Sequence, residues 1–418
     1  MESQELLSVL EARERLLAGV GVLDFENIVT ETAVGRVMAE DVLSPHDVPT
    51  FASSSMDGYA VRAADVAGAS ADSAVALPVT ADIPAGSGIP QELAEGAAAR
   101  IMTGAPLPAG ADAVVPIELT DDSGDRGDTR APQNVSVLSS VETGDCVRPA
   151  GLDMRSGEQV LAAGDYLRPQ EIGVLAAVGR GRVRVVRKPR VAILSTGDEL
   201  VVVGGSLGPG QIRDANSFML SSLVRRYGGV PTLLGIARDR AQDVEAMLDR
   251  ALEFGTDWLL SSGGVSVGAF DCVRSVVERH GKISFWRVNM RPGKPLAFGH
   301  YKGTPFLGVP GNPVSAMVSF EVFARPALQK LSGRCALDKP SVEVTVLDEF
   351  VSDGRESYLR VMVCREEDGF VARSVGSQDS GILTSLVRAN ALLIVPAGET
   401  RVAAGRRMHA WMLDWMHD

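Results

Sequence analysis

Cysteine and histidine are scarce in this chain of 418 residues. The four cysteines (Cys146, Cys272, Cys335 and Cys364) lie far apart and form no C-x-x-C pair, and the five histidines form no H-E-x-x-H motif. Zinc sites and disulfide frameworks depend on such close spacing. The sequence therefore predicts free, buried thiols in a reducing compartment, and it argues against a zinc site and a disulfide scaffold.

A long apolar segment and an excess of positive charge are also absent. No apolar run reaches the roughly 20 residues that a bilayer-spanning helix needs, and residues 1–5 lack the basic and apolar regions of a signal peptide. We therefore expect a cytoplasmic protein with no membrane insertion. The formal net charge of −12 argues against nucleic acid as a partner. A few local cations and backbone N–H groups can still hold a small anion on an acidic protein.

The composition that remains is that of a soluble globular protein, with 45% apolar and 22% charged residues. The chain is too long for one ordinary core, and its length predicts roughly two to four domains. An amphipathic helix is predicted over residues 3–17, and a second, short helix over 30–38. Residues 75–141 show short strands and turns without a convincing helix, which predicts a small β module.

Residues 191–325 form the stretch around which we expect the rest of the chain to be organised. Apolar, strand-like runs at 191–194, 258–260 and 306–307 each end in a loop rich in Gly, Ser, Asp or Pro. Successive β-α-β units at this spacing predict a parallel sheet covered on both faces, whose loops meet at the edge where such sheets bind ligands. Helices are predicted over residues 217–227, 241–254, 271–280 and from Asn312-Pro313 onward.

Two loops of this stretch could hold chemistry. Asp198-Glu199 follows the first strand and could bind Mg²⁺ and orient a ligand, or it could simply cap a turn. Ser262, Gly263 and Gly264 belong to a Gly- and Ser-rich loop that leads into a helix, and the backbone N–H groups of such a loop can form an anion pocket. The loop is neither a Walker A motif nor a G-x-G-x-x-G motif, which excludes P-loop ATPases and dinucleotide-binding enzymes.

Arg287, Arg291 and Lys294 form a third feature, a cation cluster interrupted by Pro292-Gly293. Cations on a rigid turn suit a phosphate group, although the cluster alone could be a solvated basic turn. Taken together, the three features predict an enzyme or a binding protein for a phosphorylated, anionic small molecule, with Mg²⁺ as the expected metal.

The flanking segments are less informative. Asp57 lies in a loop of small residues that could approach a ligand closely, yet its composition favours an ordinary Asp-Gly turn. The basic run 180–190 is interleaved with valines and predicts a half-exposed strand. Beyond residue 333 the pattern predicts a small all-β domain, a partly closed barrel.

Six strings in the chain carry a resemblance to a known family: SMDGYAVR, MTGAPLPAGADAVV, STGDELV, SSGGVSVGAFD, RPGKPLAFG and GVPGNPVSA. In this order they resemble the molybdopterin molybdenumtransferase family of the MoeA type, which includes the E domain of gephyrin. The resemblance extends from the N-terminal helix to the C-terminal β domain, and so it covers essentially the whole chain.

The resemblance implies a homodimer of elongated subunits with an α/β plus β fold in four parts. Residues 1–47 with 141–186 would form an elongated dimerisation part, and 48–140 an inserted β module. Residues 187–332 would form a doubly wound α/β domain like the molybdopterin adenylyltransferases, and 333–418 a small β-barrel-like domain. The active site would lie between the α/β domain and the inserted module of the partner subunit.

The implied reaction uses adenylylated molybdopterin and molybdate as substrates. In the presence of Mg²⁺ the phosphoanhydride is cleaved, molybdenum is delivered to the dithiolene and AMP leaves. A molybdopterin adenylyltransferase that hands over the substrate is an expected partner.

The resemblance also implies residue roles, carried over motif by motif. Asp57 and Thr103 would face the site from the inserted module, with Asp153 beside them on the following segment. The carboxylates that bind Mg²⁺ or position the substrate or water would be Glu199, Asp239 and Asp271. The substrate would contact the Ser262–Gly264 loop and the following side chains: Arg287, Arg291 and Lys294 for phosphate and molybdate, Pro310 and Pro313 for the molybdate pocket, and Arg360 and Ser380 from the C-terminal domain.

Two departures from the family pattern concern substrate handling. Arg287 and Arg291 occupy positions where the family usually has lysine, and a guanidinium fork is not equivalent to a compact ammonium at an oxyanion. Leu152 occupies a position where an acidic residue usually precedes Asp153. These changes bear on molybdate handling and leave the expected fold unchanged.

Two other functions are compatible with the resemblance. Like gephyrin, the chain could be a scaffold that docks a disordered tail of a membrane or cytoskeletal protein, with weak or no insertase activity. The presence of Asp57, Thr103, Glu199, Asp239 and Asp271 favours the enzyme. Adenylyl transfer to molybdopterin itself is the third possibility, but it belongs to single-domain relatives and would not need the other three parts.

Overall fold

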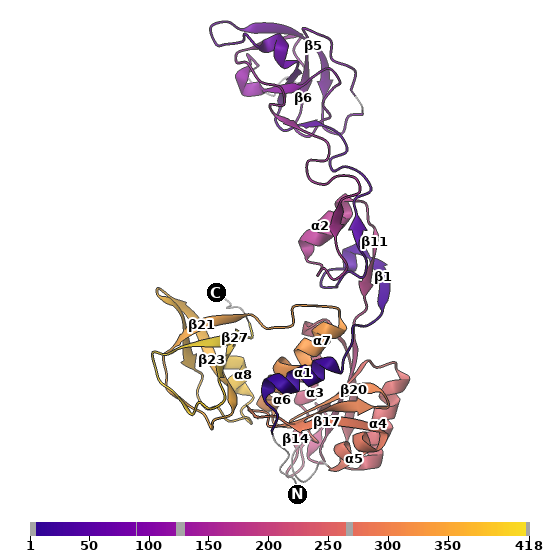
Figure 1. The fold of residues 1–418 in the computed structure, drawn as a ribbon, viewed down its shortest axis with the longest axis vertical. Helices are drawn as coiled ribbons and strands as arrows, with labels where there is room; N and C mark the ends of the chain where they lie inside the picture. The colour runs from indigo at the N-terminus through magenta and orange to yellow at the C-terminus, as the bar shows by residue number, and fades with distance from the viewer. Residues whose placement is uncertain (1–5, 89, 123–129, 265–270, 415–418) are drawn as a thin grey trace.

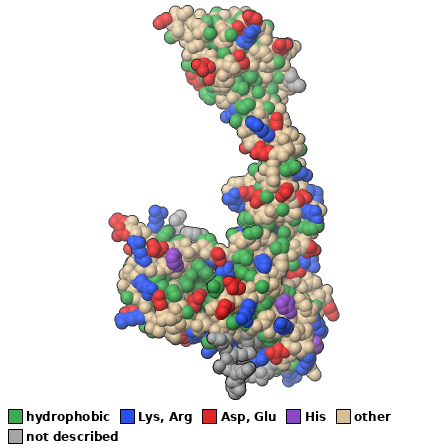
Figure 2. All heavy atoms as spheres, viewed as in Figure 1, with side chains coloured by type: hydrophobic (Ala, Val, Ile, Leu, Met, Phe, Trp, Pro, Cys, Tyr) green, Lys and Arg blue, Asp and Glu red, His purple; other side chains and the backbone are tan. Residues whose placement is uncertain are grey.

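The computed structural model describes residues 6–88, 90–122, 130–264 and 271–414. It is an elongated molecule with a wide base, a narrow arm and a separate β module at the far end of the arm (Figure 1). The base holds a central α/β domain with the C-terminal β domain beside it, and the space-filling view shows the arm as a neck between two wider ends (Figure 2). The expected α/β plus β, multidomain fold is confirmed.

The central sheet has six strands in the order β15-β12-β16-β20-β19-β17. The first four are parallel, as predicted. β19 pairs antiparallel with β20, and β17 pairs antiparallel with β19, and the sequence pattern predicted neither pairing. Alternate residues of β12 enter different cores: Val191 and Ile193 face one cluster, and Ala192 and Leu194 face the other. The strands are β12 (Arg190–Thr196), β15 (Val230–Ala237), β16 (Trp258–Ser262), β17 (Gly281–Arg287), β19 (Pro295–Tyr301) and β20 (Thr304–Val309).

Helices cover both faces of this sheet, because the buried strands are apolar on both sides. One core includes residues of α3, α6 and α7, and the other includes residues of α4 and α5. A π-helical turn, Phe320–Ala324, joins α6 to α7. The helices are α3 (Asn216–Arg226), α4 (Ala241–Glu253), α5 (Asp271–His280), α6 (Pro313–Ser319) and α7 (Arg325–Leu331).

The N-terminal helix α1 (Val9–Ala18) packs into the core of the central domain. Ser8 caps it in a capping box with Glu11, which fixes the start of the helix after residue 8. Leu16 is fully buried in the same cluster as the sheet, and Lys330 of α7 donates to the Leu17 carbonyl at 2.6 Å. Helix α1 is therefore anchored on the base, whereas the segment that follows it enters the arm.

The arm is built from two widely separated segments of sequence. β1 (Phe25–Val29) pairs antiparallel with β11 (Arg182–Val186), so the basic run does form the predicted half-exposed strand. Only one 3-10 turn, Thr30–Thr32, forms where a helix over 30–38 was expected. The chain turns at Gly35, whose φ of +80° is a left-handed conformation that ends helical structure. The other elements are β2 (Val42–Leu43), β10 (Gln159–Leu161) and α2 (Pro169–Ala177).

The β module carries a five-stranded sheet in the order β7-β4-β6-β5-β8. Its own buried side chains include Tyr59, Val61 and Val115, and they form clusters separate from those of the arm and the base. The strands are β4 (Gly58–Val61), β5 (Val75–Ile83), β6 (Ala98–Ile101), β7 (Ala113–Pro116) and β8 (Asn134–Val137). The short 3-10 helices η2 (Ala63–Val66) and η3 (Ile117–Leu119) and the pair β3 (Ser53–Ser54) and β9 (Val147–Arg148) complete it.

The C-terminal domain is a closed five-stranded barrel. Its strands pair in the cycle β23-β24-β21-β27-β25 and back to β23, which closes the barrel that the sequence predicted as partly closed. The short strand β18 (Met290–Arg291) of the central domain joins it by pairing with β23. The elements are β21 (Ser341–Val346), β22 (Phe350–Val351), β23 (Glu356–Glu366), β24 (Gly369–Ser374), α8 (Thr384–Arg388), β25 (Ala391–Val395), β26 (Arg401–Val402) and β27 (Arg407–Met412).

Ion pairs hold the connection between the arm and the base. Arg187, just after β11, makes a bidentate pair with Asp257 at 2.6 Å and also contacts Asp24. These contacts join both strands of the arm connection to the start of β16.

No helix in the described ranges is long and apolar enough to cross a membrane.

The packing of α1 generates a stability prediction. Leu16→Ala removes a fully buried side chain and should lower the free energy of unfolding of the base by about 2–5 kcal/mol. Leu10→Ala changes a side chain of the same helix that is 63% exposed, and it should have an effect within about 0.5 kcal/mol. Urea unfolding monitored by tryptophan fluorescence measures both, since Trp258 lies in the same cluster. Equal effects of the two substitutions would contradict the placement of α1.

Candidate active site

A cavity of about 700 Å³ lies at the carboxyl edge of the parallel strands. The register explains why the loops meet there: Ser262 of β16 is paired with Ser195 of β12 and with Val309 of β20. The barrel closes one side with residues of its own. The wall residues include Thr196, Glu199, Asp214, Asn216, Asp239, Ser262, Gly263, Gly264, Arg291, Lys294, Pro310, Asn312, Pro313, Arg355, Gln378, Asp379 and Ser380.

Carboxylates of two adjacent strands form the acidic part of the cavity. Glu199 follows β12 and Asp239 follows β15, and both line the cavity. The Asp239 backbone N–H lies 3.5 Å from Oδ1 of Asp198. Burial raises the pKa of Asp239, and the negative charges of Asp198 and Glu199 raise it further. Mutual repulsion of this kind is relieved by a cation, so these side chains suit a divalent metal electrostatically.

The described side chains do not complete a metal site by themselves. Within the ranges that the structure describes, no group of three or more His, Cys, Asp or Glu side chains could hold a metal ion. Asp271 is the first residue of α5, but its side chain lies outside the described part of the structure. The third carboxylate of the expected set therefore stays a prediction.

The glycine loop after β16 approaches the end of β12 closely. A Cβ on Gly263 would lie 2.5 Å from the Thr196 carbonyl oxygen, and one on Gly264 would lie 2.6 Å from Cγ2 of Val273. Both glycines have positive φ, at +82° and +66°, so other residues are excluded by space and by conformation. The remainder of the expected anion loop, residues 265–270, lies outside the described residues.

Cations line the opposite part of the cavity. Arg291 in β18 and Lys294 both belong to its wall, separated by the tight turn at Pro292-Gly293. Arg287 does not: it is exposed at the end of β17 and is absent from the wall. Arg355 of the barrel lines the cavity instead, and its guanidinium donates to the Met290 carbonyl at 2.9 Å. Of the three predicted cations the structure brings Arg291 and Lys294 to the cavity wall, and it adds Arg355, which the sequence did not reveal.

The barrel supplies a loop that reaches the cavity. Asn312 Nδ2 donates to Ser380 Oγ at 2.8 Å, and the Val314 N–H at the start of α6 donates to the Ser380 carbonyl at 3.2 Å. Arg360 is buried behind this loop and donates to the carbonyls of Ser377 and Asp379, both at 3.0 Å. Burial lowers the pKa of Arg360. Ser380 thus lines the cavity, whereas Arg360 shapes the loop from behind.

The residues predicted to reach the site from the inserted module do not line this cavity. Thr103 donates from both its backbone N–H and its hydroxyl to Asp57 Oδ1, each at 2.8 Å. Asp153 is exposed on the segment after β9 and does not line the cavity. The module stands at the far end of the arm from the central sheet (Figure 1). A single subunit therefore brings Glu199 and Asp239 to the cavity without Asp57, Thr103 or Asp153.

Asn216 is a cavity residue that sequence reasoning missed. Its Nδ2 donates to Ser262 Oγ at 2.9 Å and to the Gly311 carbonyl at 2.6 Å, which ties together the loops after β16 and β20. Asp214, two residues before α3, is buried and accepts from the Ser217 N–H in the first turn of the helix at 3.1 Å. The run Asp214-Ala-Asn-Ser before a predicted helix was the signal available, because Asp and Asn concentrate at helix starts.

The raised pKa of Asp239 generates a pH prediction. A raised pKa means that ionised Asp239 destabilises the folded state at pH 7, and that this cost disappears below about pH 4, where the carboxyl is protonated in both states. Asp239→Asn should therefore raise the melting temperature at pH 7 by roughly 1–3 °C in buffer that contains EDTA. Thermal denaturation at pH 7 and pH 4 measures this. A gain of the same size at both pH values would show that charge is not its cause.

Comparisons with known proteins agree with this architecture. Three family models match in order: the MoeA N-terminal region (domain I and II) at residues 7–179, a probable molybdopterin binding domain at 192–330, and the MoeA C-terminal region (domain IV) at 343–413. The molybdopterin molybdenumtransferase of Nostoc sp. is 40% identical, over 92% of this chain and 87% of its own. Molybdopterin molybdenumtransferase 2 of Mycobacterium tuberculosis is 38% identical, over 91% and 93%.

A solved structure shows the same fold over the full length. The molybdopterin biosynthesis moeA protein of Pyrococcus horikoshii OT3 superposes with a TM-score of 0.82 at 30% identity, covering 98% of this chain and 100% of that one. Sequence, domain order and fold agree from end to end. The chain therefore belongs to the MoeA family of molybdopterin molybdenumtransferases.

Proposed function

We propose that this protein is the molybdopterin molybdenumtransferase of a molybdenum cofactor pathway, acting on adenylylated molybdopterin and molybdate and releasing AMP. The observation that carries the proposal is one cavity with carboxylates on one part of its wall and cations on another, joined by a glycine loop. A phosphorylated pterin and an oxyanion need cations and backbone donors, and cleavage of a phosphoanhydride needs its negative charge balanced.

The cationic part of the wall would hold the anions. Arg291 and Lys294 would contact the pterin phosphate and the molybdate, with Pro310 and Pro313 shaping the molybdate pocket. Ser380 would donate a hydrogen bond from its hydroxyl to the bound anion, and Arg360 would keep the loop that carries Ser380 in place. Arg291 brings a planar fork that can bind an oxyanion through two N–H groups, whereas lysine acts as a point charge. Arg287, exposed outside the cavity, would attract the substrate at longer range.

The acidic part of the wall would hold Mg²⁺ and orient the adenylylated end of the substrate. Glu199 and Asp239, with Asp271, would bind the metal, whose chemical contribution when bound is to neutralise charge on the phosphoanhydride. Ser262, Gly263 and Gly264 would present the rigid edge against which the phosphates lie. Asn216 would keep this edge in register with the loop after β20.

Asp57, Thr103 and Asp153 would reach the cavity of the partner subunit in a homodimer. Within one chain the arm holds the module far from the central sheet (Figure 1), and Figure 2 shows hydrophobic side chains at the surface of this arm. The exposed residues of the arm include Val22, Phe25, Val29, Val34 and Leu43, a surface that pairing with a second copy would cover. The four-part division, with boundaries near residues 48, 141, 187 and 333, belongs to the same proposal.

The cellular setting follows from the substrate. We place the enzyme in the cytoplasm, where a molybdopterin adenylyltransferase would hand over the adenylylated substrate. The scaffold alternative is not favoured, because the relatives named above are transferases and the similarity to them extends over nearly their whole length.

The first test is single-turnover AMP release from adenylylated molybdopterin. Release should require both molybdate and Mg²⁺, and Glu199→Ala should slow it by on the order of 10²-fold, since a carboxylate at the reacting phosphates is lost. Arg291→Ala should have a similar effect, whereas Arg287→Ala, outside the cavity, should reduce the rate by roughly tenfold or less. AMP release that ignores molybdate, or none at all in the wild type, would refute the proposed activity.

The second test uses mixed dimers to locate Asp57. Asp57→Ala and Glu199→Ala subunits are each expected to be inactive alone. If the site is shared between subunits, random mixing should restore about a quarter of the wild-type activity, because half of the dimers are mixed and each holds one intact site. If Asp57 and Glu199 acted within one chain, mixing would restore nothing. Size-exclusion chromatography confirms that each variant is still a dimer.

A further inference from the structure

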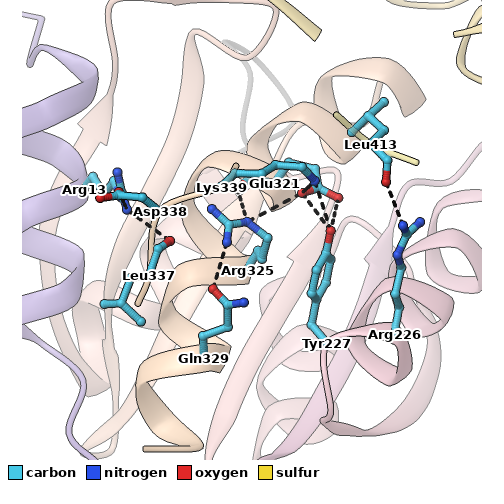
Figure 3. Close-up of polar contacts among 10 residues, drawn as sticks. All are labelled: Arg13, Arg226, Tyr227, Glu321, Arg325, Gln329, Leu337, Asp338, Lys339 and Leu413. Atoms are coloured by element: carbon cyan, nitrogen blue, oxygen red, sulfur yellow. Dashed lines mark hydrogen bonds and ion pairs between the residues drawn. The ribbon is translucent and has the colours of Figure 1, made fainter. Parts of the chain in front are cut away.

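A cluster of charged side chains is buried where the central domain meets the C-terminal barrel (Figure 3). Glu321, in the π-helical turn between α6 and α7, is only 1% exposed. Lys339 Nζ lies 2.7 Å from Glu321 Oε2, and Arg325 Nε lies 3.6 Å from the same oxygen. Tyr227 donates its hydroxyl to Glu321 at 2.8 Å. Buried charges are costly unless they are paired, and this cluster lies outside the wall of the cavity, so it has a role other than binding the substrate.

Lys339 lies on the only covalent connection from the central domain to the barrel. The connection runs from the end of α7 at Leu331 to the start of β21 at Ser341. Burial lowers the pKa of Lys339, and the carboxylate of Glu321 opposes that shift. A long, flexible lysine side chain buried in an ion pair is held in one position, and the chain segment that carries it is held with it.

Two further cations hold the same junction. Arg13 of α1 donates to the Leu337 carbonyl at 3.3 Å and pairs with Asp338 at 2.5 Å, on the chain entering the barrel. Arg226 of α3 donates to the Leu413 carbonyl at 2.7 Å, on the chain leaving the barrel. Figure 3 shows these contacts on either side of the Glu321 cluster. The barrel is thus held at both ends of its chain, and only the Glu321 contact is fully buried.

The position of the barrel sets the geometry of the cavity. β18 pairs with β23, which places Arg291 opposite Ser357 of the barrel. Ser380 reaches the cavity from the barrel and is bonded to Asn312 of the central domain. A change in the angle of the barrel would therefore shift Arg291 and Ser380 together, relative to the carboxylates on β12 and β15.

We infer that Glu321 is a positioning residue: through its ion pair with Lys339 it holds the barrel at the angle that completes the cavity. A buried ion pair can specify one arrangement among several packings that an apolar contact would tolerate. The inference rests on the proposed function only in taking the cavity as the substrate site. The position of the barrel itself can be measured without any substrate.

The test combines distance measurement with kinetics. Spin labels at the exposed positions Glu253 of α4 and Glu367 of the barrel, in a chain whose four cysteines are replaced by serine, report the angle of the barrel. Lys339→Met should broaden the distribution of label distances. It should also raise KM for adenylylated molybdopterin on the order of tenfold while kcat changes little, because contacts that bind the substrate are displaced.

Two variants keep this test decisive. The triple variant Glu321→Gln, Arg325→Met and Lys339→Met removes all three charges of the cluster, so no charge of the cluster is left buried without a partner, and the protein should fold like the wild type and still show the broad distribution. Lys330→Met removes a lysine from the end of α7, just before the connection that carries Lys339, but this lysine contacts the Leu17 carbonyl of α1, and its loss should leave the distances unchanged. Wild-type distances and KM in the triple variant, or equal broadening in Lys330→Met, would overturn the inference. Inactive wild-type protein would refute the proposed function and leave the distance result valid.

Discussion

The parallel pairing of β12 with β16 and of β16 with β20 is the constraint on which the rest of the structure depends. It brings the ends of strands that lie more than a hundred residues apart to one edge, with Ser262 between Ser195 and Val309. A slip of one residue would turn every side chain of a strand to the other face. Glycine at positions 263 and 264 is part of the same constraint, since any Cβ there would collide with Thr196 or Val273.

The cavity separates charges on a protein whose overall charge is strongly negative. Glu199 and Asp239 of its wall follow β12 and β15, Asp214 precedes α3 and Asp379 comes from the barrel. Arg291 and Lys294 come from the turn before β19, and Arg355 from the barrel. Arg291 and Lys294 belong to the central domain, as Glu199 and Asp239 do, whereas Arg355 and Ser380 come from the barrel. The complete wall of the cavity therefore depends on how the barrel sits on the central domain. The strand pairing of β18 with β23, the bond between Asn312 and Ser380 and the buried Glu321–Lys339 pair all serve that placement.

The arm keeps Asp57 and Thr103 away from the cavity of their own chain. Two antiparallel strands, fixed to the base by Arg187 and Asp257, carry the module away from the cavity of its own chain. Within the module, Thr103 donates two hydrogen bonds to Asp57, which hold the two residues together. In the homodimer that we propose, a second subunit would bring these residues to the cavity.

Local sequence was sufficient for the features that depend on local physics. Strand and helix periodicity predicted three of the four parallel strands and α3 to α5, and the Asn312-Pro313 start signal predicted the beginning of α6. The short motifs predicted Glu199, Ser262, Arg291 and Lys294 as candidates in the loops of this domain, whereas Asp239 came only from the family resemblance. These features follow from side-chain period, helix capping and turn chemistry, which act within a few residues. The family resemblance added roles for residues whose chemistry alone did not distinguish them from ordinary turns.

Tertiary structure decided what depends on distant partners. The antiparallel strands β17 and β19, the closure of the barrel and the packing of α1 on the base rest on contacts that no window of sequence contains. The same is true of Arg355 and Asn216, which become cavity residues only because separate loops converge, and of Arg287, which that convergence leaves outside. Tertiary structure also decided the burial of Glu321 beside Lys339. From the sequence, a charged residue in an otherwise apolar helix is expected to be exposed, and only the folded structure shows the partner that allows its burial.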